Sequence, residues 1–360
     1  MTSIQTLQSR LRDAGIDAAV FSDTINQRYL SGFHFDDGLV LVTQKKAYLI
    51  TDFRYAEAAV QTCSDRMEIV TPGQIGMLNF VRTALEEEGC ETLLIEEEKL
   101  SVAGLERYQD RLPGIRIGSG ASAMLTEMRM TKTEEELAAI ARAQSVTDAA
   151  FAHILSFIQP DRMTEIEVAL ELEFFMRRNG SEGVAFDTIA VSGTNSSRPH
   201  GVPRNIKLER GFLTMDFGAR ADGYCSDMTR TVVIGKADAE LKKVYHTVLA
   251  AQTAALDAAR EGISCRELDR IARDLIDSAG YAGTFGHSLG HGVGLFIHEK
   301  PNLSQAAPAD SLLCRGNVVT FEPGIYLEGK YGCRIEDMAC IKPDGTFFDF
   351  TKSPKELIEL

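Results

Sequence analysis

The sequence predicts two domains joined by a short linker: an α/β domain over residues 1–123, a linker over 124–133, and an α+β domain with pseudo-two-fold symmetry over 134–360. Three observations predict this division. Strand and helix signals alternate in the first part, a pair of helices repeats in the second, and a stretch of small residues separates the two. A chain of 360 residues with 44% hydrophobic content can bury the cores of two medium domains.

The first part carries apolar, β-branched runs between amphipathic segments. Strands are expected at 17–23, 38–52 (a hairpin that turns at Gln44-Lys45), 68–72 and 92–98, and helices at 4–14, 53–61, 74–89 and 101–111. The small-residue stretch GSGASA follows, and Thr133 and Glu136 then have the spacing of a capping box, which marks a new helix start.

The second part contains an internal repeat. MTEIEVALELEFFMRRNG (163–180) and ISCRELDRIARDLIDSAG (263–280) align at an offset of 100 residues, and each ends with a glycine suited to a helix C-terminus. Each opens with a capping-box pattern, Thr164 with Glu167 and Ser264 with Glu267. Longer helices are expected before them, at 134–158 and 239–260. Duplicated elements predict two related halves, and a site at their interface would take residues from both.

Two expected hairpins each place a pair of carboxylates on either side of a turn. The pairs are Asp216 and Asp227 around Ala221-Asp222-Gly223, and Glu322 and Glu336 around Gly329-Lys330. Residues opposite each other on antiparallel strands have Cβ atoms about 5 Å apart, and diagonal neighbours about 7 to 8 Å. One such pair is also compatible with a solvated surface hairpin. Four carboxylates beside apolar, β-branched strands indicate a metal site, because buried carboxylates without partners are costly.

A glycine-rich segment, GHSLGHGVGLFIHE, contains His287, His291 and His298, three of the seven histidines in the chain. His287 and His291 have the i, i+4 spacing of a helical zinc site, but the surrounding glycines argue against a helix and there is no HExxH motif. A lone histidine is more often a packed core residue than a ligand. Three histidines within twelve residues indicate a catalytic or ligand-binding role instead.

Composition narrows the class of protein and its partners. The net charge of −14 disfavours nucleic acid or an anionic membrane as the main partner. No apolar run approaches the roughly 18 residues of a membrane span, and the N-terminus is an amphipathic helix start rather than a signal peptide. Seven cysteines without a CxxC pair fit reduced thiols. We therefore expect a cytoplasmic protein.

Taken together, these motifs resemble the pita-bread metallopeptidases, in the proline-specific branch of aminopeptidase P and prolidase. The matching stretches are FDTIAVSGTNSSRPHG, TMDFGARADGYCSDMTRT, GHSLGHGVGLFIHE, VVTFEPGIY and CRIED, in this order. INQRYLSGF and TDFRYAEAA resemble the N-terminal domain of the same branch, which methionine aminopeptidases normally lack. The resemblance covers nearly the whole chain. It implies a creatinase/prolidase-like N-terminal domain followed by a pita-bread catalytic domain.

The resemblance also implies a site for two divalent metal ions. The implied ligands are Asp216, Asp227, His291, Glu322 and Glu336. Family habit favours manganese, and oxygen ligands with one imidazole also suit cobalt, iron or zinc. Glu322 is in addition the implied general base.

Further residues are implied around the metals. His200 and His298 are expected to bind the substrate, stabilise the tetrahedral intermediate and guide proton transfer, and His287 is expected to contact the substrate. Arg334 shares a strand face with Glu336, so it is expected to act in catalysis by orienting a metal carboxylate or by binding near the substrate. Thr229 has the same spacing to Asp227 and is expected to hydrogen-bond to it.

The implied reaction is hydrolysis of the bond between an N-terminal residue and proline. TDFRYAEAA and GTNSSRPHGVP favour aminopeptidase P, which accepts peptides of varied length; the alternative is prolidase, which takes only dipeptides. A metal-free hydrolase like creatinase is disfavoured because all five ligands are present. A metal-dependent hydrolase of a non-peptide amide stays open. A non-enzymatic pita-bread binding protein is disfavoured, since such proteins typically lose ligands or gain basic tails.

The expected partners are proline-containing peptides and a second copy of the chain, as a homodimer. In related enzymes the N-terminal domain drives dimerisation and brings a loop near the partner's active site. The candidate segment here is Phe33–Asp37, in SGFHFDDGLV, and an ordinary polar turn is the alternative.

Overall fold

The computed structural model describes residues 2–360, which divide after Arg129 into two compact units. The first unit is built on a six-stranded mixed sheet with the order β4-β3-β2-β1-β5-β6. Its strands are β1 (Ala18–Phe21), β2 (Gly38–Thr43), β3 (Ala47–Thr51), β4 (Glu68–Val70), β5 (Thr92–Leu94) and β6 (Arg116–Gly118). Its helices are α1 (Ser3–Asp13), α2 (Thr24–Ser31), α3 (Phe53–Cys63), α4 (Met77–Glu88), α5 (Val102–Arg111) and α6 (Ala121–Met130), with a 3-10 turn η1 (Gly73–Ile75).

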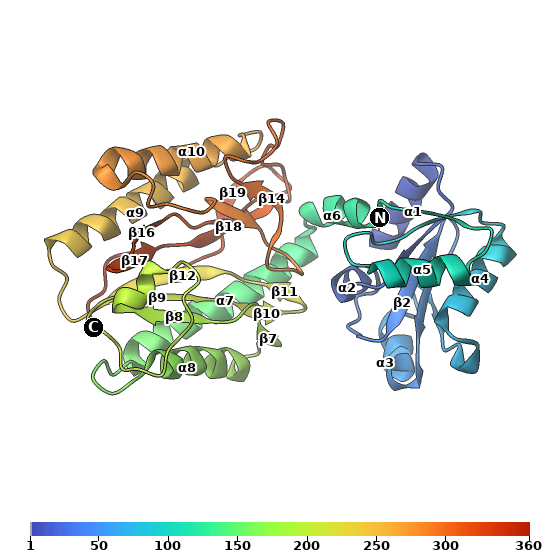
Figure 1. The fold of residues 1–360 in the computed structure, drawn as a ribbon, viewed down its shortest axis with the longest axis horizontal. Coiled ribbons are helices and arrows are strands. Elements are labelled where there is room, and N and C mark those ends of the chain that lie inside the picture. Colours follow the sequence, from blue (N-terminus) through green and yellow to red (C-terminus); the bar gives the residue numbers. More distant parts are fainter. Residues whose placement is uncertain (1) are drawn as a thin grey trace. The chain divides into compact units, whose positions relative to one another are not determined.

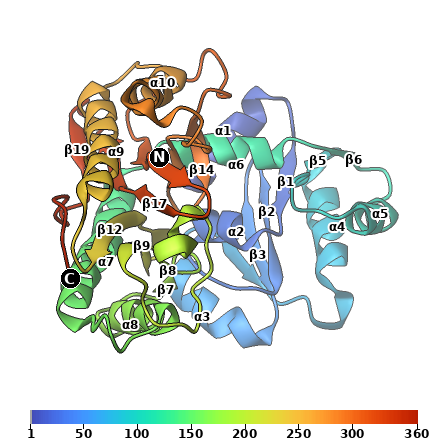
Figure 2. The ribbon, with the colours of Figure 1, turned by 60° about the vertical axis from the view of Figure 1, so that its left-hand side comes forward.

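Both faces of this sheet are buried. Because successive side chains along a strand point to opposite faces, neighbouring residues pack into two different clusters. Phe21 and Val40 pack in a cluster with residues of α1, α2, α3 and α6. Val20 and Leu41 point the other way and pack with residues of α4 and α5. Figure 2 shows α4 and α5 on one side of the sheet and α1, α2 and α3 on the other. The expected α/β class of this part is therefore confirmed.

Two helices of this unit lie where the sequence analysis expects none. Helix α2 is short and polar, and is delimited by the N-cap Asp23 and by Gly32 in the left-handed region. Helix α6 begins inside the small-residue stretch, where Ala121 and Ser122 are buried and allow close packing. The segment 124–133, which the sequence suggests as a linker, is helical as far as Met130, so only Thr131–Thr133 separate α6 from α7.

The second unit repeats one arrangement: a long helix, a shorter helix, then strands that include a hairpin. The first half has α7 (Glu134–Phe157), α8 (Glu165–Arg178), β7 (Gly183–Val184), β8 (Ile189–Ser192), the 3-10 turn η2 (Gly193–Ser197), β9 (Gly211–Phe217), β10 (Ala219–Ala221), β11 (Tyr224–Cys225) and β12 (Met228–Ile234). The second half has α9 (Ala239–Ala258), α10 (Cys265–Ile276), the π-helical turn η3 (Asp277–Tyr281), β13 (Gly290–Gly292), β14 (Glu299–Leu303), β15 (Val318–Phe321), β16 (Gly324–Leu327), β17 (Tyr331–Arg334), β18 (Asp337–Ile341) and β19 (Phe347–Asp349). The predicted duplication is confirmed.

The helix starts confirm two of the three predicted capping boxes, at Thr133 and Thr164. The third is wrong. Ser264 accepts a hydrogen bond from the backbone of Arg266 rather than from the third residue of the helix. Glu267 instead forms an ion pair with Arg270, with 2.6 Å between Oε1 and Nη2, so the neighbouring arginine withdraws it from the cap.

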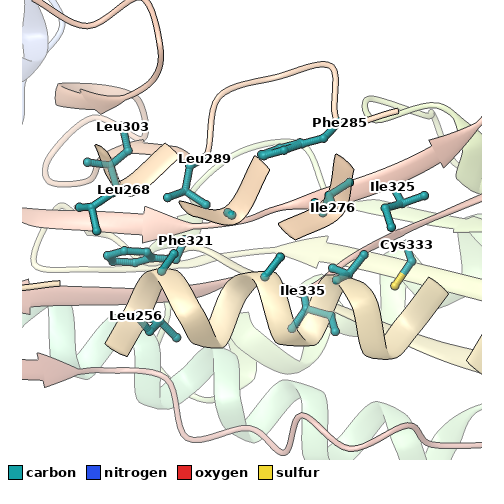
Figure 3. Close-up of a cluster of buried hydrophobic side chains, with 14 of the residues drawn as sticks. Leu256, Leu268, Ile276, Phe285, Leu289, Leu303, Phe321, Ile325, Cys333 and Ile335 are labelled. Carbon is teal, nitrogen blue, oxygen red and sulfur yellow. The ribbon is translucent and has the colours of Figure 1, made fainter. Parts of the chain in front are cut away.

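The core of the second unit holds its helices against its strands. Figure 1 shows α9 and α10 along one side of the strands and α7 and α8 along the other. Figure 3 shows the cluster under α9 and α10, where Leu256 and Leu268 meet Phe321 and Ile335 of the second-half hairpin. These side chains are buried, so packing fixes the strands that lead into the second-half hairpin. Across residues 2–360, none of the helices has the length and apolar character that crossing a bilayer requires.

Candidate metal centre

The second hairpin brings Glu322 and Glu336 to an interruption in its ladder. Strand β15 pairs with β18 as far as Phe321 opposite Asp337, and β16 pairs with β17 from Gly324 opposite Arg334. Both ladders follow the register expected from a turn at Gly329. The two glutamates lie between the ladders, where the strands separate and carboxylates can turn inward without breaking paired backbone.

The first hairpin has the same form with a shifted turn. Asp222 and Gly223 both have positive φ, 49° and 85°, as a two-residue type I′ turn requires. The strands therefore pair Asp216 with Thr229, and Asp227 lies diagonally across from Asp216. The turn centre assumed in the sequence analysis is displaced because these two residues, and not Ala221, occupy the left-handed positions.

Three side chains converge most closely. One ligand atom each of Asp227, His291 and Glu336 lie within 4.8 Å of one another. Nε2 of His291 is also 3.4 Å from a carboxylate oxygen of Glu322 and 3.6 Å from one of Asp227. His291 comes from β13 and the carboxylates come from the two hairpins, so both halves of the unit contribute.

Asp216 is the fourth carboxylate beside this group, and Arg334 holds it in place by a hydrogen bond. Its Oδ2 accepts a hydrogen bond of 2.6 Å from Nη2 of Arg334. Its Oδ1 is buried and has no hydrogen-bond partner among residues 2–360. A buried carboxylate oxygen without a donor is an acceptor that a cation can satisfy.

Burial dominates the electrostatics of the group. It raises the pKa of Asp227 and of Glu336 well above the usual carboxyl range, and the neighbouring carboxylates add to the shift. Burial also raises the pKa of Glu322 to about 8, although Arg334 opposes this. It lowers the pKa of His291 to about 4, so its imidazole is neutral at pH 7. Carboxylates that lack compensating charge, next to a neutral imidazole, are a suitable donor set for divalent cations.

Arg334 organises the neighbourhood of the carboxylates. Besides Asp216, its guanidinium donates to the hydroxyl of Tyr326 at 2.7 Å and to that of Thr229 at 3.0 Å. The expectation that Thr229 bonds to Asp227 is wrong, because its hydroxyl donates to Oε2 of Glu336 at 2.8 Å. The backbone explains this: Glu336 N donates to the carbonyl of Thr229, so β12 runs beside the second hairpin at this point.

The three other candidate histidines, His200, His287 and His298, line the same cavity. The ring of His298 lies 4.5 Å from that of His291, centroid to centroid. Nε2 of His287 is 2.9 Å from the hydroxyl of Tyr326, and burial lowers the pKa of His287 to about 3. His200 is exposed and reaches the cavity from the loop after η2. The five implied metal ligands, the three further histidines and Arg334 therefore all line one cavity.

This cavity has a volume of about 510 Å³, within the usual range for small-molecule sites. The sequence analysis misses Asp187, Asn302 and Ser304 in its lining, and it also misses Tyr326, which bonds to the lining residues His287 and Arg334. Tyr326 had a detectable signal, since a hairpin centred on Gly329 places it diagonally across from Arg334. Asp187 lies in the matching stretch FDTIAVSGTNSSRPHG but was not singled out there, and nothing local around Asn302 and Ser304 indicates that their loop approaches the site.

The fold and the site together define a metallopeptidase with an additional N-terminal domain. The model of the Creatinase/Prolidase N-terminal domain matches residues 4–131, and that of Metallopeptidase family M24 matches residues 138–343. The chain belongs to metallopeptidase family M24. Its catalytic part has the expected pita-bread fold. Members of this family use divalent metals, and Asp227, His291 and Glu336 form a group that could hold such an ion.

Relatives match over the full length. The chain is 40% identical to a Xaa-Pro dipeptidase of Pyrococcus furiosus, over 99% of each chain. Among solved structures, a Xaa-Pro dipeptidase from Bacillus anthracis is 41% identical, with a TM-score of 0.93 and 99% of each chain covered. An X-Pro aminopeptidase from Thermotoga maritima is 36% identical, with a TM-score of 0.89, over 98% of this chain and 100% of that one.

Proposed function

We propose that this protein is a metal-dependent Xaa-Pro dipeptidase, that is, a prolidase. The observation that carries the proposal is the full-length similarity to Xaa-Pro dipeptidases at 40% and 41% identity. It favours the alternative of the sequence analysis over aminopeptidase P, which was the main expectation there. The X-Pro aminopeptidase relative at 36% identity keeps that activity as the second candidate.

In this proposal two divalent ions, with manganese first, are held by residues from both hairpins and β13. The ligands are Asp216, Asp227, His291, Glu322 and Glu336. The four carboxylates carry a charge that two divalent ions balance. When bound, the ions supply a Lewis acid for the scissile carbonyl and lower the pKa of a coordinated water.

The protein's own residues then bind, orient and move protons. Glu322 accepts the proton of the attacking water at a carboxylate oxygen. His298, next to His291, stabilises charge on the carbonyl oxygen, and together with His200 it guides a proton to the prolyl nitrogen, which becomes a secondary amine. Arg334 holds Asp216 through one oxygen and leaves the other for the cation. His287 contacts the substrate from beside Tyr326.

The test is cleavage of matched peptides. Manganese-loaded protein is assayed on Ala-Pro, Ala-Pro-Ala and Ala-Ala by release of the N-terminal alanine. We expect Ala-Pro to be cleaved with a kcat/KM roughly tenfold or more above that of Ala-Pro-Ala. An enzyme discriminates between substrates by how strongly it binds their transition states, and a dipeptidase should bind that of the dipeptide more strongly. The reverse order identifies an aminopeptidase. Cleavage of Ala-Ala alone, or full activity in thoroughly chelated protein, contradicts both candidates.

We also propose a homodimer, as the resemblance implies, with sedimentation velocity as its test. The segment Phe33–Asp37 contributes less free surface than its sequence suggests. Phe35 is fully buried, and Phe33 stacks on it with 5.7 Å between ring centroids. Only His34, Asp36 and Asp37 expose their side chains, so these three are the residues to replace when asking whether the loop reaches a neighbouring site.

A further inference from the structure

A buried ion pair lies outside the metal-binding group. Nζ of Lys132 is 3.1 Å from Oε2 of Glu299, and the two side chains are 2% and 3% exposed. Pairs of this kind pay a large desolvation cost and are often no more stabilising than apolar residues of the same size. The position of this pair therefore suggests a role in geometry rather than in stability.

The Glu299 end fixes a loop beside the metal-binding group. Oε1 of Glu299 accepts a hydrogen bond of 3.1 Å from the backbone of Phe296, and Gly294 N donates to the Phe296 carbonyl at 3.1 Å. A Cβ on Gly294 would lie 2.5 Å from Oε2 of Glu299, so the carboxylate fills the inside of the loop. His298 projects from this same loop, one residue before Glu299, toward the ring of His291.

The Lys132 end arrives from a fixed stretch of backbone. Lys132 lies in the connection between α6 and α7, and its backbone N donates to the carbonyl of Gly316 at 2.9 Å. Nδ2 of Asn317 donates to the carbonyl of Met130 at 3.0 Å. Gly316 has a φ of +80°, and a Cβ there would lie 2.7 Å from Thr131. The ammonium is thus presented to Glu299 from an anchored support.

We propose that Lys132 and Glu299 form a positioning pair for the reaction: they hold the 294–299 loop so that His298 stays over the metal-binding group. Neither residue lines the cavity that contains the metal-binding group, and in this proposal the pair acts through His298. The kcat measurement for this pair rests on the proposed function, whereas the measurement of hydrogen exchange in the loop does not.

The experiment uses a variant that removes both charges without leaving one of them buried alone. Lys132→Met/Glu299→Gln keeps similar volumes and an oxygen that accepts from Phe296 N. Lys132→Arg keeps the charge and serves as the conservative variant. Arg315→Met/Glu261→Gln is the matched control, since it removes an exposed pair of the same unit, 2.8 Å apart.

We expect the double variant to bind metal as the wild type does, with KM within about threefold and kcat lowered roughly 10- to 100-fold, the scale of a displaced catalytic group. Lys132→Arg should retain most of the kcat. In metal-free protein, hydrogen exchange of residues 293–300 should become about tenfold faster or more in the double variant alone. The control should match the wild type in every measurement.

Two outcomes overturn the proposal. In the first, the double variant shows unchanged kcat and unchanged hydrogen exchange. In the second, its kcat falls only in parallel with its metal content or its global stability, and Lys132→Arg shows the same loss. If the wild type cleaves no Xaa-Pro peptide, the proposed function fails separately. The exchange of residues 293–300 then still decides, because unchanged exchange overturns the pair and faster exchange supports it.

Discussion

Arg334 shows how one buried side chain can set several others. Its guanidinium bonds to Asp216, Tyr326 and Thr229 at once, and Thr229 passes the contact on to Glu336. Because the fork is planar and rigid, a lysine cannot make all three contacts from one position. Arg334 therefore connects carboxylates that belong to different hairpins.

We expect Arg334→Lys to weaken metal binding by roughly 10- to 100-fold, the usual effect of losing a partner that orients ligands. Metal affinity by isothermal titration is the measurement. Tyr326→Phe is the companion variant, because it removes one contact of Arg334 and leaves Asp216 held. Metal affinity in Arg334→Lys equal to that of the wild type would contradict this assignment.

His291 and His298 are adjacent rings with different proposed tasks. His291→Ala should lose metal, since its nitrogen is 3.4 Å from an oxygen of Glu322 within the group. His298→Ala should keep metal near the wild-type level and lower kcat by about 10² or more. Metal content by mass spectrometry together with kcat distinguishes the two. If His298→Ala loses metal as completely as His291→Ala, the division of roles is incorrect.

Glu165, at the start of α8, holds the chain that leads to His200. Its carboxylate accepts from Ser192 N at 2.7 Å, from Asn195 Nδ2 at 3.0 Å and from Arg204 N at 2.8 Å, and it forms an ion pair with the Arg204 side chain. One buried carboxylate thus holds together the segment that runs from the end of β8, through η2, to residue 204.

We expect Glu165→Ala to lower the free energy of unfolding by about 3 kcal/mol, the low end for a broken buried pair, because the Arg204 side chain is 34% exposed and partly solvated. Glu167→Ala, which removes a capping-box contact in the same turn, should cost only about 1 kcal/mol. Urea unfolding compares the two. Equal losses would mean that Glu165 acts merely as a helix-start residue.

Strand β19 carries a carboxyl group whose titration affects stability. Burial raises the pKa of Asp349 to about 7, with a contribution from Asp337. The folded state therefore holds this proton more tightly than the unfolded state. Its stabilising contribution is complete below about pH 4, the usual carboxyl pKa, and is lost as the pH rises to about 7.

In metal-saturated protein, we expect the melting temperature of Asp349→Asn to depend less on pH between about 4.5 and 7.5 than that of the wild type. Metal saturation removes the protons of the central carboxylates from the comparison. Differential scanning fluorimetry at several pH values is the measurement. Parallel curves for the two proteins would show that Asp349 titrates at its ordinary pKa.

Sequence reasoning succeeded where one local signal determined the structure. The hairpin around Gly329 follows the predicted register because its turn lies midway between the glutamates. The hairpin at Asp222 is displaced because the residues that adopt positive φ decide the pairing. Lys132 and Glu299 are 167 positions apart, so no local pattern could join them. Contacts of that kind come from tertiary packing alone.

Each of the two units has its own buried cores. Two hydrophobic clusters belong to residues before 130, and three belong to residues after it. The candidate metal residues all lie in the second unit. Each unit can therefore unfold as a separate cooperative element.

Calorimetry should show two transitions, and chelation should lower only one of them, by several degrees, because a ligand that binds one folded unit stabilises that unit. Adding manganese to the chelated protein should restore the lowered transition, while the other stays in place. A single transition that moves as a whole would show instead that the units unfold together.

The burial of Lys132 also determines how the chain responds to proteases. Trypsin cuts after lysine or arginine and needs a stretch of backbone that can leave the fold, and Lys132 is the only basic residue in the connection Thr131–Thr133. Its side chain is 2% exposed, so the native chain resists trypsin at the junction where a two-domain protein is commonly nicked. The rate of tryptic cleavage after Lys132 should therefore follow how often the Lys132–Glu299 ion pair opens. The same rate then reports on the mobility of the loop that carries His298.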